Sequence, residues 1–177
     1  WACRNGHKDV VKLLLDQNID MNTRELTGCT AFMLACSFGH KDVVKLLLDH
    51  SDQNIDLKTR GVTGKTPFMI ACQNGRKDVV QLLLDHSDII ELNARNNNGQ
   101  TAFMLACGFG HKDVVQLFLD HSDQNIDFIA KNKNGETAMM MACQRGHQDI
   151  VQLIQSKLAS NSYLGFLARK FKEMLPF

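Results

Sequence analysis

Near copies of the segment TAFMLACGFGHKDVVQLFLD, residues 101–120, recur along the whole chain. All copies share an Ala-Cys pair that is followed by glycine three residues after the cysteine. The pairs begin at residues 2, 35, 71, 106 and 142, so successive copies are 33, 36, 35 and 36 residues apart. A period in this range indicates stacked helical repeats, in which each unit buries its apolar face against its neighbours.

Each copy predicts two short helices and a turn. The segment Thr101–Cys107 is apolar and ends at a glycine, which predicts a first helix closed by a left-handed residue. The segment Asp113–Leu119 has a broad apolar face and an acidic residue at its amino end, which predicts a second helix. Polar stretches such as ARNNNGQT, residues 94–101, predict tight turns that project from the stack.

These features together resemble the ankyrin repeat, a turn followed by two antiparallel helices. TPFM at residues 66–69 is similar to the family's Thr-Pro-Leu-His motif, although methionine takes the place of histidine. The resemblance covers residues 1–156 and implies an all-α ankyrin-repeat solenoid of stacked helix-turn-helix units. We expect about five repeats, the first one truncated, with units near 1–24, 25–60, 61–95, 96–131 and 132–156. The turn after each second helix is longer than in the family, so the resemblance does not supply its shape.

The sequence supports one prediction for the amino end of the chain and one for the carboxyl end. Trp1 aligns with the middle of a first helix, so we expect the natural protein to extend upstream. Residues 157–177 have an amphipathic pattern in which Leu164, Leu167 and Phe171 share one face, and Pro176 ends it. We interpret this segment as a C-terminal capping helix, since a solenoid needs a cap on its last unit. Docking on a membrane or a partner's groove is the alternative.

The composition limits which kinds of partner and which cellular compartment are expected. Twenty basic and nineteen acidic residues give a net charge of +1, which does not favour nucleic acid as the partner. The sequence has no apolar run of transmembrane length and no signal-peptide pattern at its start. Equivalent cysteines on stacked helices are expected to lie about 8 to 10 Å apart, too far for a disulfide. We therefore expect reduced thiols and a cytoplasmic or nuclear protein.

The cysteines and histidines recur from unit to unit, which favours a structural role over a catalytic or metal-binding one. A Cys-x3-His spacing, as at Cys36 and His40, could hold zinc, but a glycine separates the two side chains and Arg76 replaces histidine in one unit. We interpret the cysteines as small buried side chains and the histidines as structural hydrogen-bond donors, as the resemblance implies. The sequence contains no nucleotide-binding or nucleophile motif. We expect no cofactor, no metal ion and no catalytic activity.

Residues that vary between units are the candidates for partner binding. In ankyrin-like stacks the turn tips and the ends of the first helices line a concave face. Phe38 and Phe109 would be aromatic anchors there, or would pack against neighbouring turns. The candidate partner-binding residues are Leu26, Ser37, Phe38, Val62, Gln73, Asn74, Asn97, Phe109, Lys133, Gln144 and Arg145. The apolar turn tips, Leu26 and Val62, place the apolar part of the groove toward the amino end.

A second candidate is a basic ridge just before the turns. Its residues are Arg24, Arg60, Arg95 and Lys131. The ridge could bind acidic side chains or phosphates. It could instead be a salt-bridged edge, paired within the same loops to Asp20, Asp56, Glu91 and Asp127.

The sequence therefore predicts a non-catalytic scaffold or adaptor that binds a partner protein or peptide, as a monomeric segment of a longer chain. The alternative is the substrate-recruiting or regulatory segment of a larger enzyme, channel or ubiquitin-ligase receptor. A stack of units with no partner is a third possibility, against which the uneven spacings and the free cysteines argue.

Overall fold

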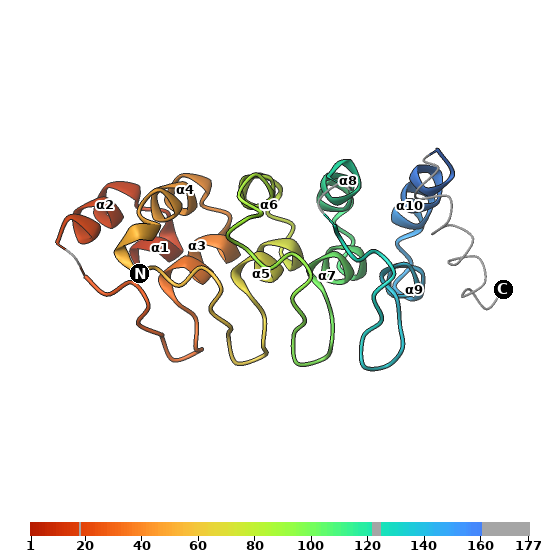
Figure 1. The fold of residues 1–177 in the computed structure, drawn as a ribbon, viewed down its shortest axis with the longest axis horizontal. Coiled ribbons are helices and arrows are strands. Elements are labelled where there is room, and N and C mark those ends of the chain that lie inside the picture. Colours follow the sequence, from red (N-terminus) through yellow and green to blue (C-terminus); the bar gives the residue numbers. More distant parts are fainter. Residues whose placement is uncertain (18, 122–124, 161–177) are drawn as a thin grey trace.

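A computed structural model of the chain describes residues 1–17, 19–121 and 125–160, and this part contains helices and no β-strand. Two rows of helices run side by side along an elongated stack (Figure 1). The first helix of each unit is α1 (Ala2–Asn5), α3 (Ala31–Phe38), α5 (Pro67–Gln73), α7 (Ala102–Gly108) or α9 (Ala138–Gln144). The second helix is α2 (Lys8–Asp16), α4 (Lys41–Asp49), α6 (Lys77–Leu84), α8 (Lys112–Asp120) or α10 (Gln148–Ser160). The predicted all-α solenoid is confirmed.

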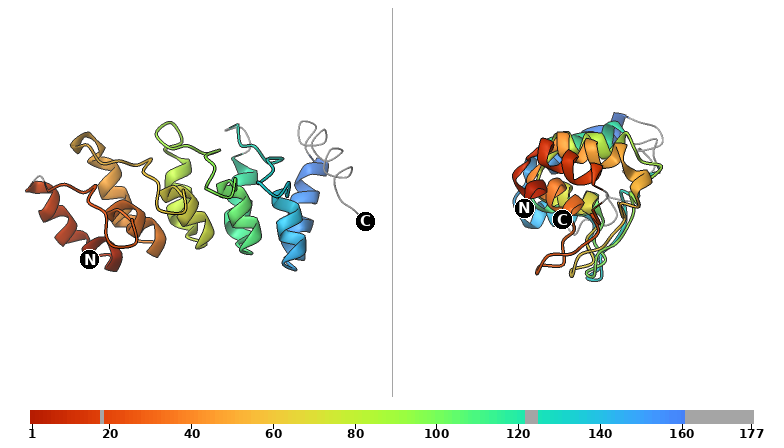
Figure 2. Two further views of the ribbon diagram at one scale, coloured as in Figure 1. Left: turned by 90° about the horizontal axis from the view of Figure 1, so that it is seen from below. Right: turned by 90° about the vertical axis from the view of Figure 1, so that its left-hand side faces the viewer.

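The turns between units all project to one side of the stack, as the end-on view in Figure 2 shows. Each helix packs on its counterpart in the next unit, α3 on α5 and α4 on α6, and on the other helix of its own unit. Every unit therefore contributes one face to the unit before it and one to the unit after it, as a solenoid requires.

A buried threonine starts four of the first helices. The Oγ1 atom of Thr101 accepts a hydrogen bond from the main-chain N–H of Met104 at 3.3 Å, so it satisfies one of the amide donors that a helix start leaves open. Thr30, Thr66 and Thr137 make the same bond to the methionine three residues on. These methionines occupy the position of the family's histidine, and each donates the bond from its main-chain N–H. At Met140 the sulfur also accepts the N–H of Thr137 at 3.5 Å, which forms a capping box.

A left-handed glycine separates the two helices of a unit. Gly39 has a φ of 82° directly after α3, and the second helix begins two residues later at Lys41. A Cβ atom on Gly39 would also lie only 2.9 Å from Cδ of Arg76 in the next unit. Glycine is therefore required both by the backbone conformation and by the close approach of the neighbouring unit.

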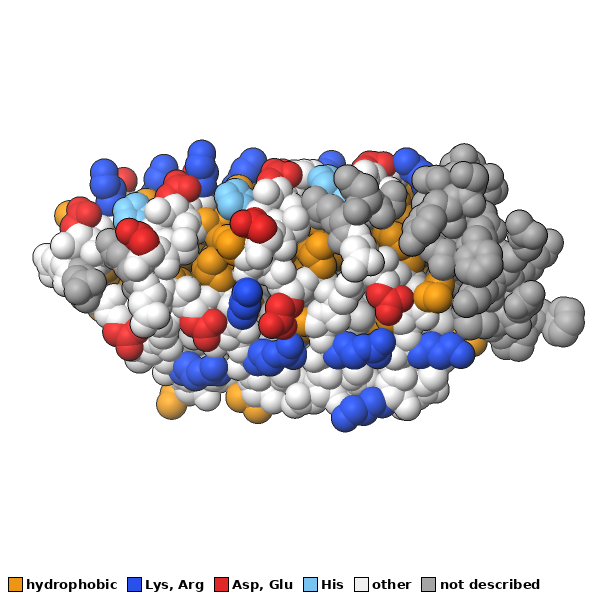
Figure 3. All heavy atoms as spheres, viewed as in Figure 1, with side chains coloured by type: hydrophobic (Ala, Val, Ile, Leu, Met, Phe, Trp, Pro, Cys, Tyr) orange, Lys and Arg blue, Asp and Glu red, His pale blue; other side chains and the backbone are white. Residues whose placement is uncertain are grey.

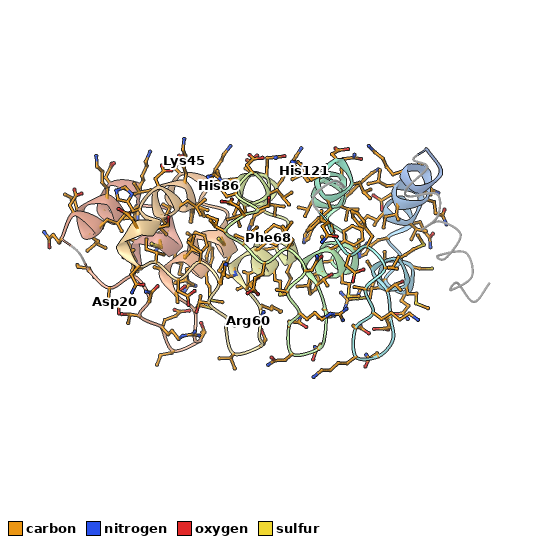
Figure 4. The ribbon with its side chains drawn as sticks, viewed as in Figure 1. Asp20, Lys45, Arg60, Phe68, His86 and His121 are labelled. Carbon is orange, nitrogen blue, oxygen red and sulfur yellow. The ribbon has the colours of Figure 1, made fainter. Side chains whose placement is uncertain are left out.

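Aromatic and thiol side chains fill the middle of the stack. The rings of Phe103 and Phe118 are 5.4 Å apart between centroids, and Phe118 also contacts Phe68 at 5.7 Å. Figure 4 shows Phe68 inside the stack. Cys36, Cys72 and Cys107 are fully buried in successive first helices, and all six cysteines of the chain are unpaired. The expected small buried side chain is confirmed at Cys3, Cys36, Cys72 and Cys107, but it is wrong for Cys143, which is exposed at the same position of the last described helix pair.

A histidine shapes the long loop after a second helix. His50 Nδ1 donates to the carbonyl oxygen of Leu46 at 2.8 Å, and a 3₁₀ turn (Ser51–Gln53) and the left-handed Asn54 follow. His86 and His121 make the equivalent bond to the carbonyl four residues before them. A histidine that binds one of the last carbonyls of a helix is a C-terminal cap, so this motif ends the second helix before the long loop.

The two ends of the stack are formed by α1 and α2 at the amino end and by α9 and α10 at the carboxyl end. At the amino end, Trp1 is 82% and Leu13 62% exposed. At the carboxyl end, α10 continues to Ser160. The rest of the expected capping helix, residues 161–177, lies outside the described residues.

Candidate partner-binding surface

Two adjoining hollows lie between the projecting turns and the ends of the first helices. The larger, of about 450 Å³, is lined by Val62, Thr63, Lys65, Asn96, Asn97, Asn98, Gln100, Leu105, Phe109 and Arg145. The smaller, of about 380 Å³, is lined by Asn98, Gln100, Asn132, Lys133, Asn134, Glu136, Met141, Gln144 and Arg145. Because they share Asn98, Gln100 and Arg145, they form one open depression across the last three units, which we call the trough.

The trough brings together part of the predicted set. Val62, Asn97, Phe109, Lys133, Gln144 and Arg145 line it. Leu26, Ser37, Phe38, Gln73 and Asn74 line neither hollow. Leu26 is fully exposed at the tip of its turn and Val62 is 76% exposed.

Sequence reasoning missed the residue that precedes the capping threonine. Lys65, Gln100 and Glu136 occupy this column and line the trough. The equivalent residue of the second unit is Cys29. Four different residue types in one turn column are the same signal of variability that identified the other candidates, so this column could have been found.

Phe38 and Phe109 remain partly accessible, at 42% and 44% of their surface. An arginine from a neighbouring unit stacks on each ring: the guanidinium carbon of Arg4 is 5.2 Å from the centroid of Phe38, and that of Arg145 is 5.1 Å from the centroid of Phe109. A cation over an aromatic ring is favourable and covers part of the ring. Each phenylalanine is thus held by an arginine and still presents apolar surface.

The ends of the first helices are tied to the following unit by side chains. His40 Nε2 donates to the carbonyl oxygen of Arg4 at 2.8 Å, and His111 Nε2 donates to that of Gln73 at 2.7 Å. Structural hydrogen bonds by these histidines, which the family resemblance implied, are confirmed. Arg76, which replaces histidine, donates through Nε to the Ser37 carbonyl at 2.8 Å and so keeps the bond.

Two candidate binding residues share this structural role. Asn74 Nδ2 donates to the Ser37 carbonyl at 3.2 Å, and Arg145 Nη1 donates to the Gly108 carbonyl at 2.8 Å. These bonds satisfy carbonyl groups that a helix end leaves open. Variation at these positions therefore reflects two ways of making one interhelical bond, as well as the surface that each side chain presents.

The basic ridge is a ladder of hydrogen bonds to the backbone. Nη1 of Arg24 donates to the carbonyl of Arg60 at 2.7 Å, and Nη1 of Arg60 donates to that of Arg95 at 2.7 Å. Arg95 reaches Lys131 O in the same way at 2.5 Å. Each of these arginines also donates to the glycine carbonyl of its own turn. The ladder therefore joins the bases of the four turns.

The expected pairing of the ridge within its own loops is wrong. Arg60 pairs with Glu91 of the next loop at 2.9 Å, and both side chains are nearly half exposed. The carboxylate of Asp56 instead accepts the main-chain N–H of Lys58 at 3.0 Å, which closes a local turn. Asp20 closes the same turn in the first loop. Figure 3 shows Lys and Arg side chains in a row over the turn bases, with Asp and Glu side chains beside them, and Figure 4 shows Arg60 at the base of its turn.

The one acidic side chain of the trough is already bound. Asn132 Nδ2 donates to Glu136 at 2.7 Å, and this bond, with further ones from Gln144 and Asn134 and the charge of Arg145, lowers the pKa of the Glu136 carboxyl. Lys65, Lys133 and Arg145 also line the trough. The positive charge of this surface therefore exceeds its negative charge.

Side chains that could ligate a metal ion are not clustered in the described residues. No group of three or more His, Cys, Asp or Glu side chains in residues 1–17, 19–121 and 125–160 is placed to hold a metal ion. Burial raises the pKa of Cys36, Cys72 and Cys107 well above the usual value, so these thiols stay protonated near neutral pH and are poor ligands and nucleophiles.

Stacked helix pairs, projecting turns tied in a ladder and an open polar trough define this chain as a helical-repeat protein. It belongs to the ankyrin-repeat family: the family described as Ankyrin repeats (3 copies) matches residues 1–96 and 88–162. No curated protein is significantly similar in sequence to the chain. Ankyrin repeats are generally protein–protein interaction modules, and the family is typically non-catalytic. Within the described part of the chain, none of the helices has the length and apolar character needed to span a bilayer.

Proposed function

We propose that the chain is a non-catalytic scaffold or adaptor that binds a partner protein or peptide on the concave side of the stack, where the turns meet the ends of the first helices. The observation that carries this proposal is the exposure of Phe38 and Phe109. Every other phenylalanine in the described residues is at least 95% buried, namely Phe32, Phe68, Phe103, Phe118 and Phe128. A partner that covers an exposed aromatic ring removes its apolar surface from water, which favours binding.

The two rings occupy the same column, two units apart. Neighbouring units of packed helices are separated by about 8 to 10 Å, so the rings form two anchors about 20 Å apart. Aromatic residues at the centre of an interface often contribute a large part of the binding free energy. Because an arginine holds each ring in place, binding of a partner costs less side-chain entropy here than it would on a surface of mobile side chains.

The test is affinity capture from cell lysate with the parent chain and the Phe38→Ala/Phe109→Ala variant. A matched control, Val10→Ala/Leu13→Ala, removes two exposed apolar side chains of α2, outside the proposed surface. We expect a partner that the parent and the control retain, and that the double phenylalanine variant binds at least about tenfold more weakly. Urea unfolding of all three proteins checks that each is folded. Equal retention by the parent and the phenylalanine variant would mean that the proposed surface is wrong.

A further inference from the structure

We propose that the trough binds an extended, acidic peptide segment of the partner, with one apolar side chain of that segment seated on Phe109. This inference rests on the proposed function and specifies the chemistry of its partner. It is carried by three observations on the trough: its charge, its unused amide groups and its half-open aromatic ring.

The charge of the trough selects an acidic segment. Lys65, Lys133 and Arg145 line it. The single carboxylate there, Glu136, is hydrogen-bonded to Asn132 at 2.7 Å. The whole chain carries nearly equal numbers of basic and acidic residues, so the surplus is a property of this surface. Charges on one surface that lie within about 8 to 10 Å of a ligand still act on it at physiological salt.

The amide groups of the trough select an extended backbone. Within the described part of the chain the side chain of Asn98 makes no hydrogen bond, and Gln100 uses only its oxygen, which accepts from Asn96 at 3.0 Å. A side-chain amide offers a donor and an acceptor, which match the N–H and C=O of a peptide. A helical segment has already paired these groups internally and gains nothing from them, whereas an extended one presents them.

The turns that carry these amides are held in place before a ligand arrives. Asn96 Oδ1 accepts the N–H groups of Asn98 and Gln100, each at 2.9 Å. Main-chain bonds of 3.0 Å from Asn97 to Thr63 and from Lys133 to Asn98 join neighbouring turns. A surface fixed in this way loses little conformational entropy when a flexible peptide binds to it.

Phe109 supplies the apolar contact. Arg145 covers part of its ring, and 44% of the residue remains exposed above a floor that contains the buried Leu105 and Met141. An apolar side chain on the open part of the ring and a carboxylate at the arginine would use both groups together. Three units span about 20 Å, which corresponds to about six residues of extended chain at 3.3 Å per residue.

Selection from a library of random linear peptides displayed on phage tests the proposal with the full chain as the target. We expect selected peptides that are rich in Asp and Glu and contain an apolar residue. Their dissociation constants are then measured by fluorescence polarisation with the parent and with Lys133→Glu, Phe109→Ala and the control Lys77→Glu, which reverses an exposed charge on α6. We expect each trough variant to weaken binding by about tenfold or more, and the control by less than about twofold.

The remaining results of these experiments contradict either the acidic-peptide inference or the proposed function. Selected peptides that are neutral or basic, or that bind the trough variants as tightly as the parent, would contradict the inference and leave the proposed function standing. If a single-stranded RNA binds more tightly than the peptides and loses affinity equally on Lys133→Glu, the ligand of the trough is a nucleic acid and the inference of an acidic peptide is wrong. If no peptide is selected, the inference fails. The proposed function is tested separately, because lysate capture that is indifferent to Phe38 and Phe109 overturns the proposed surface whatever the peptide selection gives.

Discussion

Arginine side chains that recur before each turn contribute to the stack through the backbone of the next unit. Arg60 donates to the carbonyls of Gly64 and Arg95 with one nitrogen and to Glu91 with the other. The planar guanidinium can satisfy several acceptors at once, and a lysine ammonium on a flexible chain cannot reproduce this geometry. The column was predicted from the sequence, but its role was not, because a carbonyl acceptor in the next unit leaves no trace in the sequence.

We predict that Arg60→Lys lowers the free energy of unfolding although it preserves the charge. Because the side chain is nearly half exposed, a loss of about 1 kcal/mol is expected, which is below the range of about 1.5 to 3 kcal/mol for hydrogen bonds to charged groups. Urea unfolding followed by circular dichroism measures it. Lys58→Ala, an exposed change in the same loop, is the control. An unfolding midpoint for Arg60→Lys that equals that of the parent would show that the ladder does not contribute to stability.

The buried thiols make stability depend on alkaline pH. Burial raises the pKa of Cys3 from 9.0 to about 11, and raises that of Cys72 well above 9.0. In the unfolded chain these thiols ionise near their ordinary pKa, so the unfolded state releases protons that the folded state keeps. The contribution is fully present below about pH 9 and is lost as pH rises toward the folded pKa, at about 1.4 kcal/mol per pH unit for each thiol.

We therefore predict that the free energy of unfolding falls between pH 9 and pH 11, and falls less steeply in Cys72→Ala. Urea unfolding at several pH values gives the two slopes. The absolute stability of the variant is not the readout, since the substitution also changes packing. Equal slopes for the variant and the parent would contradict the prediction.

Helices could be predicted from the repeat pattern, whereas the loops between them could not. The glycine after each first helix and the apolar spacing of each second helix are local signals, and they place α3 to α8 near the predicted segments. The loop after α4 depends on His50 and on the left-handed Asn54, a combination for which the family pattern offers no guide. The pairing of Arg60 with Glu91 across two loops was missed because the register between loops follows from stacking.

We predict that the first helix pair is the least protected part of the described stack. Val10 of α2 is 45% exposed, whereas Val114 at the equivalent position of α8 is 1% exposed. Stability in a solenoid is the sum of unit and interface contributions, so a unit with one packed face opens more often. Hydrogen exchange followed by mass spectrometry should show faster exchange in residues 2–16 than in residues 102–120. Equal protection of the two segments would contradict this.

The molecule as a whole shows why a repeat protein reveals its fold more readily than its site. The fold depends on residues that recur in every unit, so five copies report the same information. The site depends on residues that differ, such as Lys65, Gln100 and Glu136, and each occurs once. Their grouping into one trough requires the spacing of adjacent turns, which follows from main-chain bonds such as that from Lys133 to Asn98.

Site-specific photo-crosslinking in lysate tests whether the partner binds the concave side of the stack. The photoreactive residue p-benzoylphenylalanine replaces Val62 or Asn98 on the turns in two variants, and Lys45 or Lys77 on the second helices in two others. We predict that one partner protein is crosslinked from the two turn positions and not from the helix positions. Crosslinking of the partner from Lys45 or Lys77, with none from the turns, would contradict the account.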